Sequence, residues 1–282
     1  MTHLHQNLKS VMQYGLSNDQ LRGIAPSIFA EQPWSGVSAK YQFIPTIQIV
    51  EQLRGIGLVP MSANQSRARI EGKQPFTKHQ VKFRLPGDQV ERMIQPGRHE
   101  FFKGPITPQI VITNSHDRSC VLEMVAGLFQ LACYNGLLIS VGEFENLKIR
   151  HAGSIKDNVI DVTYRIIEDF PQIGDKVQDW QTITLDPQRQ EHFAEMALGL
   201  RWPENPPLNP RQLLMVRRAE DLAPTLWNTY QRVQENLMKG GIAGTNQSNR
   251  RMRTRGIHSV SADQKLNKGL WKLTEDFAAF SV

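Results

Sequence analysis

Three histidines and one aspartate have side chains that bind metals or transfer protons. His116 and Asp117 are adjacent, and His79 and His151 lie on either side of them along the chain. Imidazole and carboxylate groups serve as zinc ligands and general bases, so these residues are one candidate catalytic centre. No third ligand follows at a fixed interval, however, and the run from Asn114 to Asp117 is typical of a turn that caps a helix. We favour the turn, and we expect no metal, no cofactor and no catalytic residue.

The motifs of common nucleotide-dependent and hydrolytic enzymes are absent from the sequence. The chain has no GxxxxGK(S/T) phosphate loop, no GxGxxG dinucleotide fingerprint and no GxSxG nucleophile turn. Carboxylate pairs at the spacing of a metal-dependent nuclease are missing as well. The sequence therefore predicts a protein that binds a partner and is not an enzyme.

Positive side chains are concentrated in two segments of the chain. The formal net charge is +6. Residues 67–84 carry six lysines and arginines with one acid, and residues 239–262 carry five with no acid, so each segment has a charge of +5. The rest of the chain therefore has a charge of −4. Focused positive charge raises the local concentration of polyanions, which favours nucleic acid as a partner.

The first basic segment contains the clearest strand of the sequence, residues 77–85. Its side chains alternate between two faces of a strand. One face carries His79, Val81, Phe83 and Leu85, and the other carries Lys78, Gln80, Lys82 and Arg84. Further cations share strand faces nearby, namely Arg67 with Arg69, and Lys148 with Arg150. Together they predict a basic sheet face that tracks a nucleic-acid backbone, although an ordinary solvated sheet face would show the same pattern.

The second basic segment contains four arginines within six residues. They are Arg250, Arg251, Arg253 and Arg255, in a polar loop that we place at 240–259. Arginine suits bidentate contacts to phosphate, so the cluster is a candidate nucleic-acid clamp. A flexible tail or a site for an acidic protein is the alternative. Four cations without acids repel one another, and we expect residues 244–256 to be weakly ordered until an anion binds.

Aromatic side chains near the basic segments are candidates for stacking on bases. Phe101 and Phe102 precede Lys103 in a predicted loop and are the preferred pair, although burial beneath that loop is an equally good interpretation. The other candidates are Trp34, Tyr41 and Phe76.

The elements that position these residues follow from periodicity and turn chemistry. Residues 1–45 are predicted to be irregular because of Pro26, Pro33 and Pro45, and a helix should begin at Thr46 and stop at Gly55 or Gly57. Strands are expected at 58–63, 77–85, 109–113 and 137–141, with 65–70 continuing a hairpin, 86–108 a loop and 119–134 a buried helix.

The second half of the chain should be helical. Helices are expected at 154–170 and 187–200, and at 221–238 and 262–280, where apolar residues recur at helical spacing. Strands and helices are segregated along the sequence, which predicts an α+β fold whose β-β-β-α-like core has a small antiparallel sheet and a buried helix. We expect an irregular segment at 1–45, an α+β core at 46–153 and a helical region at 154–282.

The two cysteines and the N-terminus bear on location. Cys120 and Cys133 would lie about 20 Å apart on one helix, too far for a disulfide, which favours a reducing compartment. The N-terminal residues lack the basic and apolar parts of a signal peptide, and no apolar run is long enough to cross a bilayer. We expect a soluble, cytoplasmic protein.

Several segments together resemble a phage- and plasmid-borne family catalogued as domain of unknown function 932. The resemblance rests on Asn114-Ser115-His116-Asp117, on the stretch from Ala132 to Leu137, and on Leu147-Lys148-Ile149-Arg150-His151. It continues through Leu226 to Asn236, Gly240-Gly241, the arginine cluster, and Leu266 to Trp271. The order of these motifs is more specific than any one of them, and the resemblance covers roughly residues 40–280.

The resemblance implies kinship with phage single-strand annealing proteins of the RecT and Red-beta type, which share a β-β-β-α core and work as rings or filaments. We therefore expect an ATP-independent protein that binds and anneals single-stranded DNA as a homo-oligomer. The alternative is a non-catalytic binding protein that inhibits a host protein, for instance in a defence system.

Overall fold

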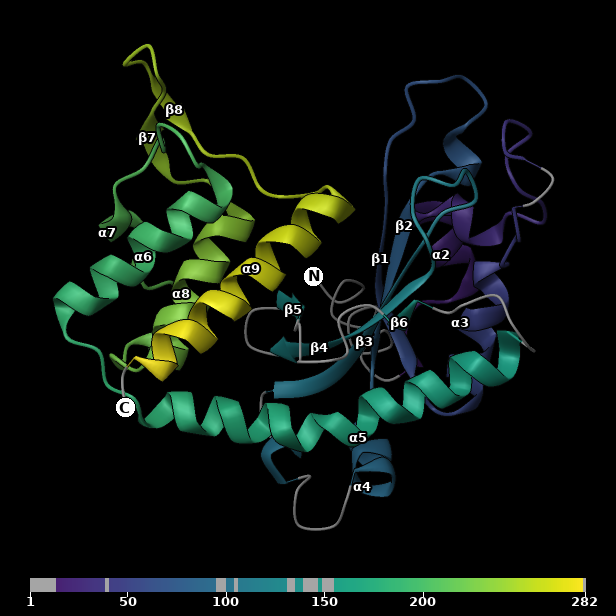
Figure 1. Cartoon of the computed structure of the whole chain (residues 1–282), viewed down its shortest axis with the longest axis horizontal. Coiled ribbons are helices and arrows are strands. Elements are labelled where there is room, and N and C mark those ends of the chain that lie inside the picture. Colours follow the sequence, from purple (N-terminus) through teal and green to yellow (C-terminus); the bar gives the residue numbers. More distant parts are fainter. Residues whose placement is uncertain are drawn as a thin grey trace, which may run out of the picture. The chain divides into compact units, whose positions relative to one another are not determined.

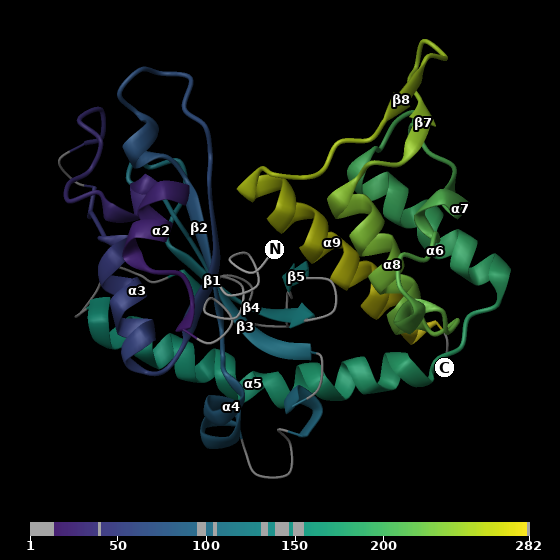
Figure 2. The same ribbon diagram turned by 180° about the vertical axis from the view of Figure 1, so that it is seen from behind.

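The computed structural model describes residues 14–38, 41–94, 100–103, 106–130, 135–138, 147–148 and 155–280 (Figures 1 and 2). The chain divides into two compact units, residues 1–171 and residues 172–282. Strands fill the first unit and helices dominate the second, so the predicted α+β class is confirmed. No helix among the described residues is long and apolar enough to cross a membrane.

The first unit is built on an antiparallel sheet. The strands are β1 (Val59–Gln65), β2 (His79–Arg84), β3 (Ile106–Asn114), β4 (Glu123–Gln130), β5 (Asn135–Leu138) and β6 (Leu147–Lys148). They pair in sequence order from β1 to β5, and β6 also pairs with β4. Every residue of β3 is buried, so the centre of the sheet is covered on both faces.

Helices α2 (Asn18–Ile24) and α3 (Thr46–Gly55), with the 3-10 turn η1 (Pro26–Phe29), lie against β1 (Figures 1 and 2). The α3 helix has the predicted bounds, and it buries Ile49, Val50 and Leu53. Residues 1–45 were predicted to be irregular, but they contain helix α2. Ser17 and Gln20 form a capping box at the start of α2, which stabilises the first turn of this helix. The prolines of the segment lie after the end of α2 and do not interrupt it.

The helix predicted at 119–134 is wrong, because residues 123–130 form strand β4. An apolar run without clear alternation fits a buried helix and a buried strand equally well. The segment forms a strand because it pairs with another strand. Strand β4 is in register with β3 over eight residue pairs, from Ile106 opposite Gln130 to Thr113 opposite Glu123. Cys120 precedes this strand as a free thiol, and Cys133 lies outside the described residues. The strand predicted at 137–141 is β5, described as far as Leu138.

Three connections also differ from the prediction. The hairpin strand β1 ends at Gln65, so residues 66–70 do not extend it. The segment 86–108 is more than a loop, because it contains α4 (Gly87–Met93), the 3-10 turn η3 (Glu100–Lys103) and the start of β3. Asp117 caps no helix; its carboxylate accepts a hydrogen bond from the Ser119 amide within a turn.

The helical prediction for the second half is confirmed. The helices are α5 (Ile155–Thr182), α6 (Pro187–Arg201), α7 (Pro210–Leu213), α8 (Leu226–Lys239) and α9 (Val260–Ala279), with the 3-10 turn η5 (Ala219–Asp221). The boundary between the units falls inside α5, directly after Pro171. In the second unit Trp180 packs on Trp271 with ring centroids 4.5 Å apart, and Tyr230 stacks beside them on Trp227.

The polar loop predicted at 240–259 contains a β-hairpin, β7 (Ala243–Thr245) paired with β8 (Arg251–Arg253). Asn246 closes its turn: the side-chain oxygen accepts hydrogen bonds from the Ser248 and Arg250 amides, and its backbone amide donates to the Arg250 carbonyl. Asparagine side chains stabilise turns in this way. The segment therefore has a defined conformation although it buries little apolar surface.

Candidate nucleic-acid interface

The connection between β1 and β2, residues 66–78, is the basic connection of the first unit. Its two ends are joined by a hydrogen bond from the Ser66 amide to the Lys78 carbonyl, at 2.8 Å. The Gln74 side chain spans the loop, accepting from the Ala68 amide at 2.8 Å and donating to the Ser66 carbonyl at 3.0 Å. Gln74 thus fixes the backbone between Arg67 and Arg69, the two predicted site residues of this segment.

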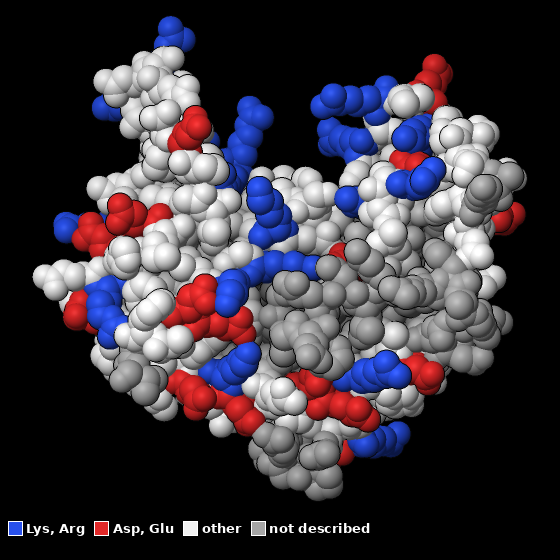
Figure 3. Space-filling view, viewed as in Figure 1, with Lys and Arg blue, Asp and Glu red and all other residues white. Residues whose placement is uncertain are grey.

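Both arginines point into solvent. Arg67 and Arg69 are exposed, and neither pairs with an acid among the residues that the structure describes. Lys73 is different, because its ammonium group lies 3.1 Å from the Asp117 carboxylate. Burial raises the pKa of Asp117, but hydrogen bonds from Ser119 and the charge of Lys73 outweigh it and leave the pKa below its usual value. The arginines are therefore the cations that remain available to a polyanion, and Lys and Arg side chains gather over this connection in Figure 3.

An aromatic pocket adjoins the basic connection. Its volume is about 460 Å³, and its lining includes Trp34, Tyr41 and Phe76. The Trp34 and Phe76 rings are 5.4 Å apart between centroids, and the Trp34 amide donates to the His116 carbonyl. Phe76 belongs to the basic connection itself, through the 3-10 turn η2 (Gln74–Phe76). The sequence indicated these three aromatic residues as candidates, and the structure brings them together beside the cations.

The preferred aromatic pair of the sequence lies elsewhere. Phe102 is 1% exposed and packs edge-on against Phe170, with centroids 5.9 Å apart. Phe101 is half-buried and packs against Phe102. A buried ring presents no face to a base, so the alternative interpretation, burial beneath the loop, holds for Phe102.

The polar face of β2 is not the open row of cations that alternation predicts. Gln80 is 1% exposed, and Lys82 and Arg84 are half-buried. Burial also lowers the pKa of Arg84. Lys148 lies in β6 opposite Glu123 of β4, and Arg150 falls outside the described residues. This face is a partly covered surface, whereas Arg67 and Arg69 of the basic connection are exposed.

The histidines form a buried network with neighbouring hydroxyl groups. His79 Nδ1 lies 2.8 Å from Ser27 Oγ, its Nε2 lies 2.8 Å from Thr46 Oγ1, and the same hydroxyl lies 3.3 Å from His116 Nε2. Burial lowers the pKa of His79 to about 4, and burial together with His79 lowers the pKa of His116 to about 3. These four residues are fully buried, which fits a structural network. His151 lies outside the described residues, among which no group of metal-binding side chains occurs.

The arginine hairpin of the second unit, residues 243–255, presents the other predicted cations. The side chains of Arg250, Arg251, Arg253 and Arg255 are all exposed. Arg253 donates to the Gly241 carbonyl at 2.9 Å. None of the four pairs with an acid in the part of the chain that the structure describes. The cluster is therefore an exposed cationic surface.

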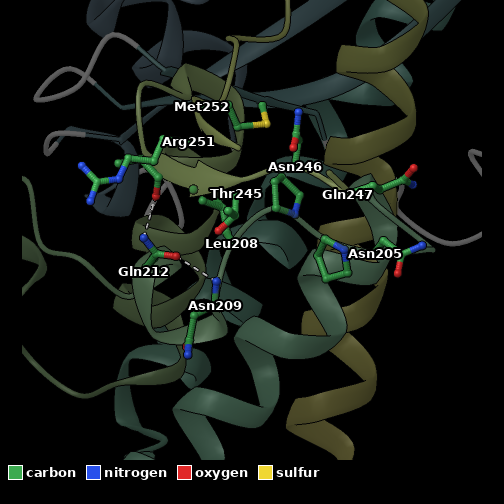
Figure 4. A pocket seen from close by; sticks show the side chains of 13 residues that line it. Asn205, Leu208, Asn209, Gln212, Thr245, Asn246, Gln247, Arg251 and Met252 are labelled. Atoms are coloured by element: carbon green, nitrogen blue, oxygen red, sulfur yellow. Dashed lines mark hydrogen bonds between the residues drawn. The ribbon is translucent and has the colours of Figure 1, made fainter. Parts of the chain in front are cut away.

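A pocket of about 920 Å³ lies beside this hairpin (Figure 4). Sequence reasoning missed it, because its lining is mostly asparagine, glutamine and proline from two segments far apart in the chain. The available signal was the density of such residues at 205–212 and 246–249.

Comparison with known proteins places the chain in a family. The UPF0380 protein YafZ of Escherichia coli (strain K12) is 34% identical over 261 residues, which cover 92% of this chain and 90% of that protein. The UPF0380 protein YfjQ of the same organism is 33% identical over the same shares. No solved structure matches the chain significantly. The family described as domain of unknown function (DUF932) matches residues 33–271, and the chain belongs to this family.

Proposed function

We propose that this protein binds and anneals single-stranded DNA without ATP, as an oligomer in the cytoplasm, and that it makes or breaks no covalent bond. The observation that carries the proposal is the aromatic pocket next to the basic connection. Arg67 and Arg69 are exposed and lack acidic partners among the described residues, and Phe76 links them to the ring of Trp34. Cations that follow a backbone beside aromatic rings that stack on bases are the two requirements of single-strand binding.

In the proposed mechanism, the arginines and the aromatic residues contribute to binding in different ways. The arginines neutralise phosphates and release counterions, which makes the affinity dependent on salt. The pocket holds an unpaired base against Trp34 and Phe76. Bases in duplex DNA are stacked and paired, so the pocket contributes to affinity for single strands alone. A strand held through its backbone and a minority of its bases leaves the other bases free to pair with a complementary strand.

The basic connection provides the direct test. Replacing Arg67 and Arg69 by glutamate should weaken binding of a labelled single strand at least ten-fold, measured by fluorescence anisotropy at low salt. The matched control is Arg92→Glu with Arg165→Glu, which makes the same change of net charge at two exposed arginines of the first unit outside the connection. Equal losses in both variants would mean that overall charge, and not this site, governs binding. Unchanged affinity in the first variant would overturn the assignment.

The aromatic residues separate the proposal from its alternative. An inhibitor that meets an acidic protein surface needs the arginines but has no use for a base pocket. Trp34→Ala should therefore weaken binding of a single strand by about five-fold or more, as expected for the loss of one stacked base. If the variant keeps full affinity and the wild-type protein binds duplex and single strand equally, the results favour the alternative, an inhibitor that binds an acidic protein surface.

A further inference from the structure

The pocket beside the arginine hairpin is a defined structural feature. Its walls are the segment 205–209, helix α7 and the hairpin strands, and its volume is about 920 Å³ (Figure 4). The lining contains no acidic side chain and no histidine, and Arg251 supplies its one charge. A metal ion would lack ligands here, and a cationic ligand would meet Arg251. The chemistry therefore suits a neutral polar group that lies next to a negatively charged one.

Hydrogen bonds fix the rear wall of the pocket. The Gln212 side chain accepts from the Asn209 amide at 2.8 Å and donates to the Ala243 carbonyl at 2.7 Å, so it links α7 to β7 (Figure 4). The Thr245 amide donates to the Pro207 carbonyl at 2.9 Å. At Gly244 the hairpin approaches the same carbonyl so closely that a side chain would collide with it. The two walls are thus held together in a defined geometry.

Several amide groups at the pocket remain available to a ligand. The side chains of Asn205 and Gln247 make no hydrogen bond to any described residue, and both are exposed. The Asn246 side chain uses its oxygen in the hairpin turn. Carboxamides offer a donor and an acceptor side by side, which matches the edge of a nucleobase. An acidic peptide would require donors alone.

Apolar side chains and arginines lie at the pocket beside these amides. Pro207 and Met252 line the pocket together with the amides, and a flat ring packs favourably on proline and on a polarizable thioether. Arg251 lies at the pocket, with Arg250 and Arg253 exposed on either side of it in the hairpin. Arginine contacts phosphate in a bidentate geometry. The pocket thus combines groups for a base edge, a base face and the adjoining phosphates.

We propose that this pocket is a base-binding subsite for single-stranded nucleic acid, in which amide side chains contact an unpaired base while the arginine hairpin binds its phosphates. The inference rests on the proposed function and extends it to a second site in a separate unit of the chain. It predicts that the two parts of the subsite fail in different ways. Loss of the amides removes base-dependent affinity, whereas loss of the arginines removes affinity for any strand.

The experiment compares two labelled oligonucleotides of equal length, one with all its bases and one abasic throughout its centre. Asn205→Ala with Gln247→Ala should weaken binding of the complete strand about five-fold or more and leave the abasic strand unaffected. Arg251→Ala with Arg253→Ala should weaken both. Gln178→Ala with Gln188→Ala, at exposed positions of the same unit, is the matched control and should change neither.

The outcomes separate this inference from the proposed function. If the wild-type protein binds neither oligonucleotide, the proposed function fails and the subsite with it. If it binds the complete strand but the amide variant matches the wild type, the subsite is wrong and the proposed function stands. An equal loss on both strands would also overturn base recognition, because it would show that the amides act through the sugar-phosphate backbone or through folding alone.

Discussion

His79 and His116 lie side by side in the first unit, with ring centroids 5.0 Å apart, and burial holds both in the neutral form. The sequence could not reveal this network. Ser27, Thr46 and His79 are distant in sequence, and only the packing of η1 and α3 against the sheet brings them together.

The two histidines should make the protein sensitive to acid. Their pKa values in the folded state, about 4 and about 3, lie below the value of about 6.5 in an unfolded chain. Unfolding therefore takes up protons below pH 6.5, and the free energy of unfolding should fall by up to about 2.7 kcal/mol per pH unit between pH 6 and 4. Asp117, whose pKa is lowered in the folded state, should reduce the free energy of unfolding further only when the pH falls below its normal pKa of 3.8.

Denaturant unfolding at a series of pH values measures this effect. His192→Gln, at an exposed position, should leave the pH dependence unchanged. A free energy of unfolding that stays constant between pH 7 and 5 would contradict the burial of neutral histidines.

Gly240 is a position whose backbone requires glycine. Its φ of 64° and ψ of −143° end helix α8, and a side chain there would collide with the Arg255 carbonyl. Gly240→Ala should reduce the free energy of unfolding by roughly 1–3 kcal/mol. Gly199→Ala, in α6 with open space around it, should instead stabilise by up to about 1 kcal/mol. Similar denaturation midpoints for the two variants would show that Gly240 is not constrained.

At the scale of elements, amphipathic helices could be predicted from sequence, and the sheet could be predicted only in part. The stripes of α5, α8 and α9 are local patterns, so periodicity locates them. Strand β4 is defined by its partner β3, to which no local pattern points. The hairpin β7–β8 escaped prediction for a related reason, because its strands are three residues long and depend on the turn at Asn246.

The arginine hairpin should determine much of the salt dependence of binding. Replacing Arg250, Arg251, Arg253 and Arg255 by alanine leaves up to four phosphates without a cation from the protein. The slope of log affinity against log salt should then decrease in magnitude by about 0.7 for each phosphate that is no longer neutralised. A control with four alanines at Arg92, Arg165, Lys265 and Lys272 has the same net charge, and all four positions are exposed. If the two variants show equal slopes, the hairpin does not bind nucleic acid.

At the scale of the whole molecule, the apolar stripe of helix α9 can pack in the core of its own unit or between subunits, and most of it lies in the core of the second unit. Leu270 and Trp271 are fully buried within the second unit. Phe280, which is 89% exposed, lies at the end of the same stripe beside the pocket formed by α6 and α9. The sequence could not distinguish these roles, because core residues and subunit-interface residues share one helical period.

The proposed annealing activity predicts assembly beyond a dimer when DNA is bound. Multi-angle light scattering of the full chain, alone and with a long single strand, measures this directly. We expect several copies of the chain on each strand. A monomer in both samples would contradict the oligomer, while binding itself would remain to be judged by affinity.

The central claim is that the protein binds single strands through exposed cations and base-stacking aromatic residues. The most direct test is an anisotropy titration of the wild-type protein with a labelled single strand and with the matching duplex, each at low and at moderate salt. The proposal predicts tighter binding of the single strand at both salt concentrations and weaker binding of both DNAs as salt rises. No binding of the single strand at low salt up to high micromolar protein would contradict it.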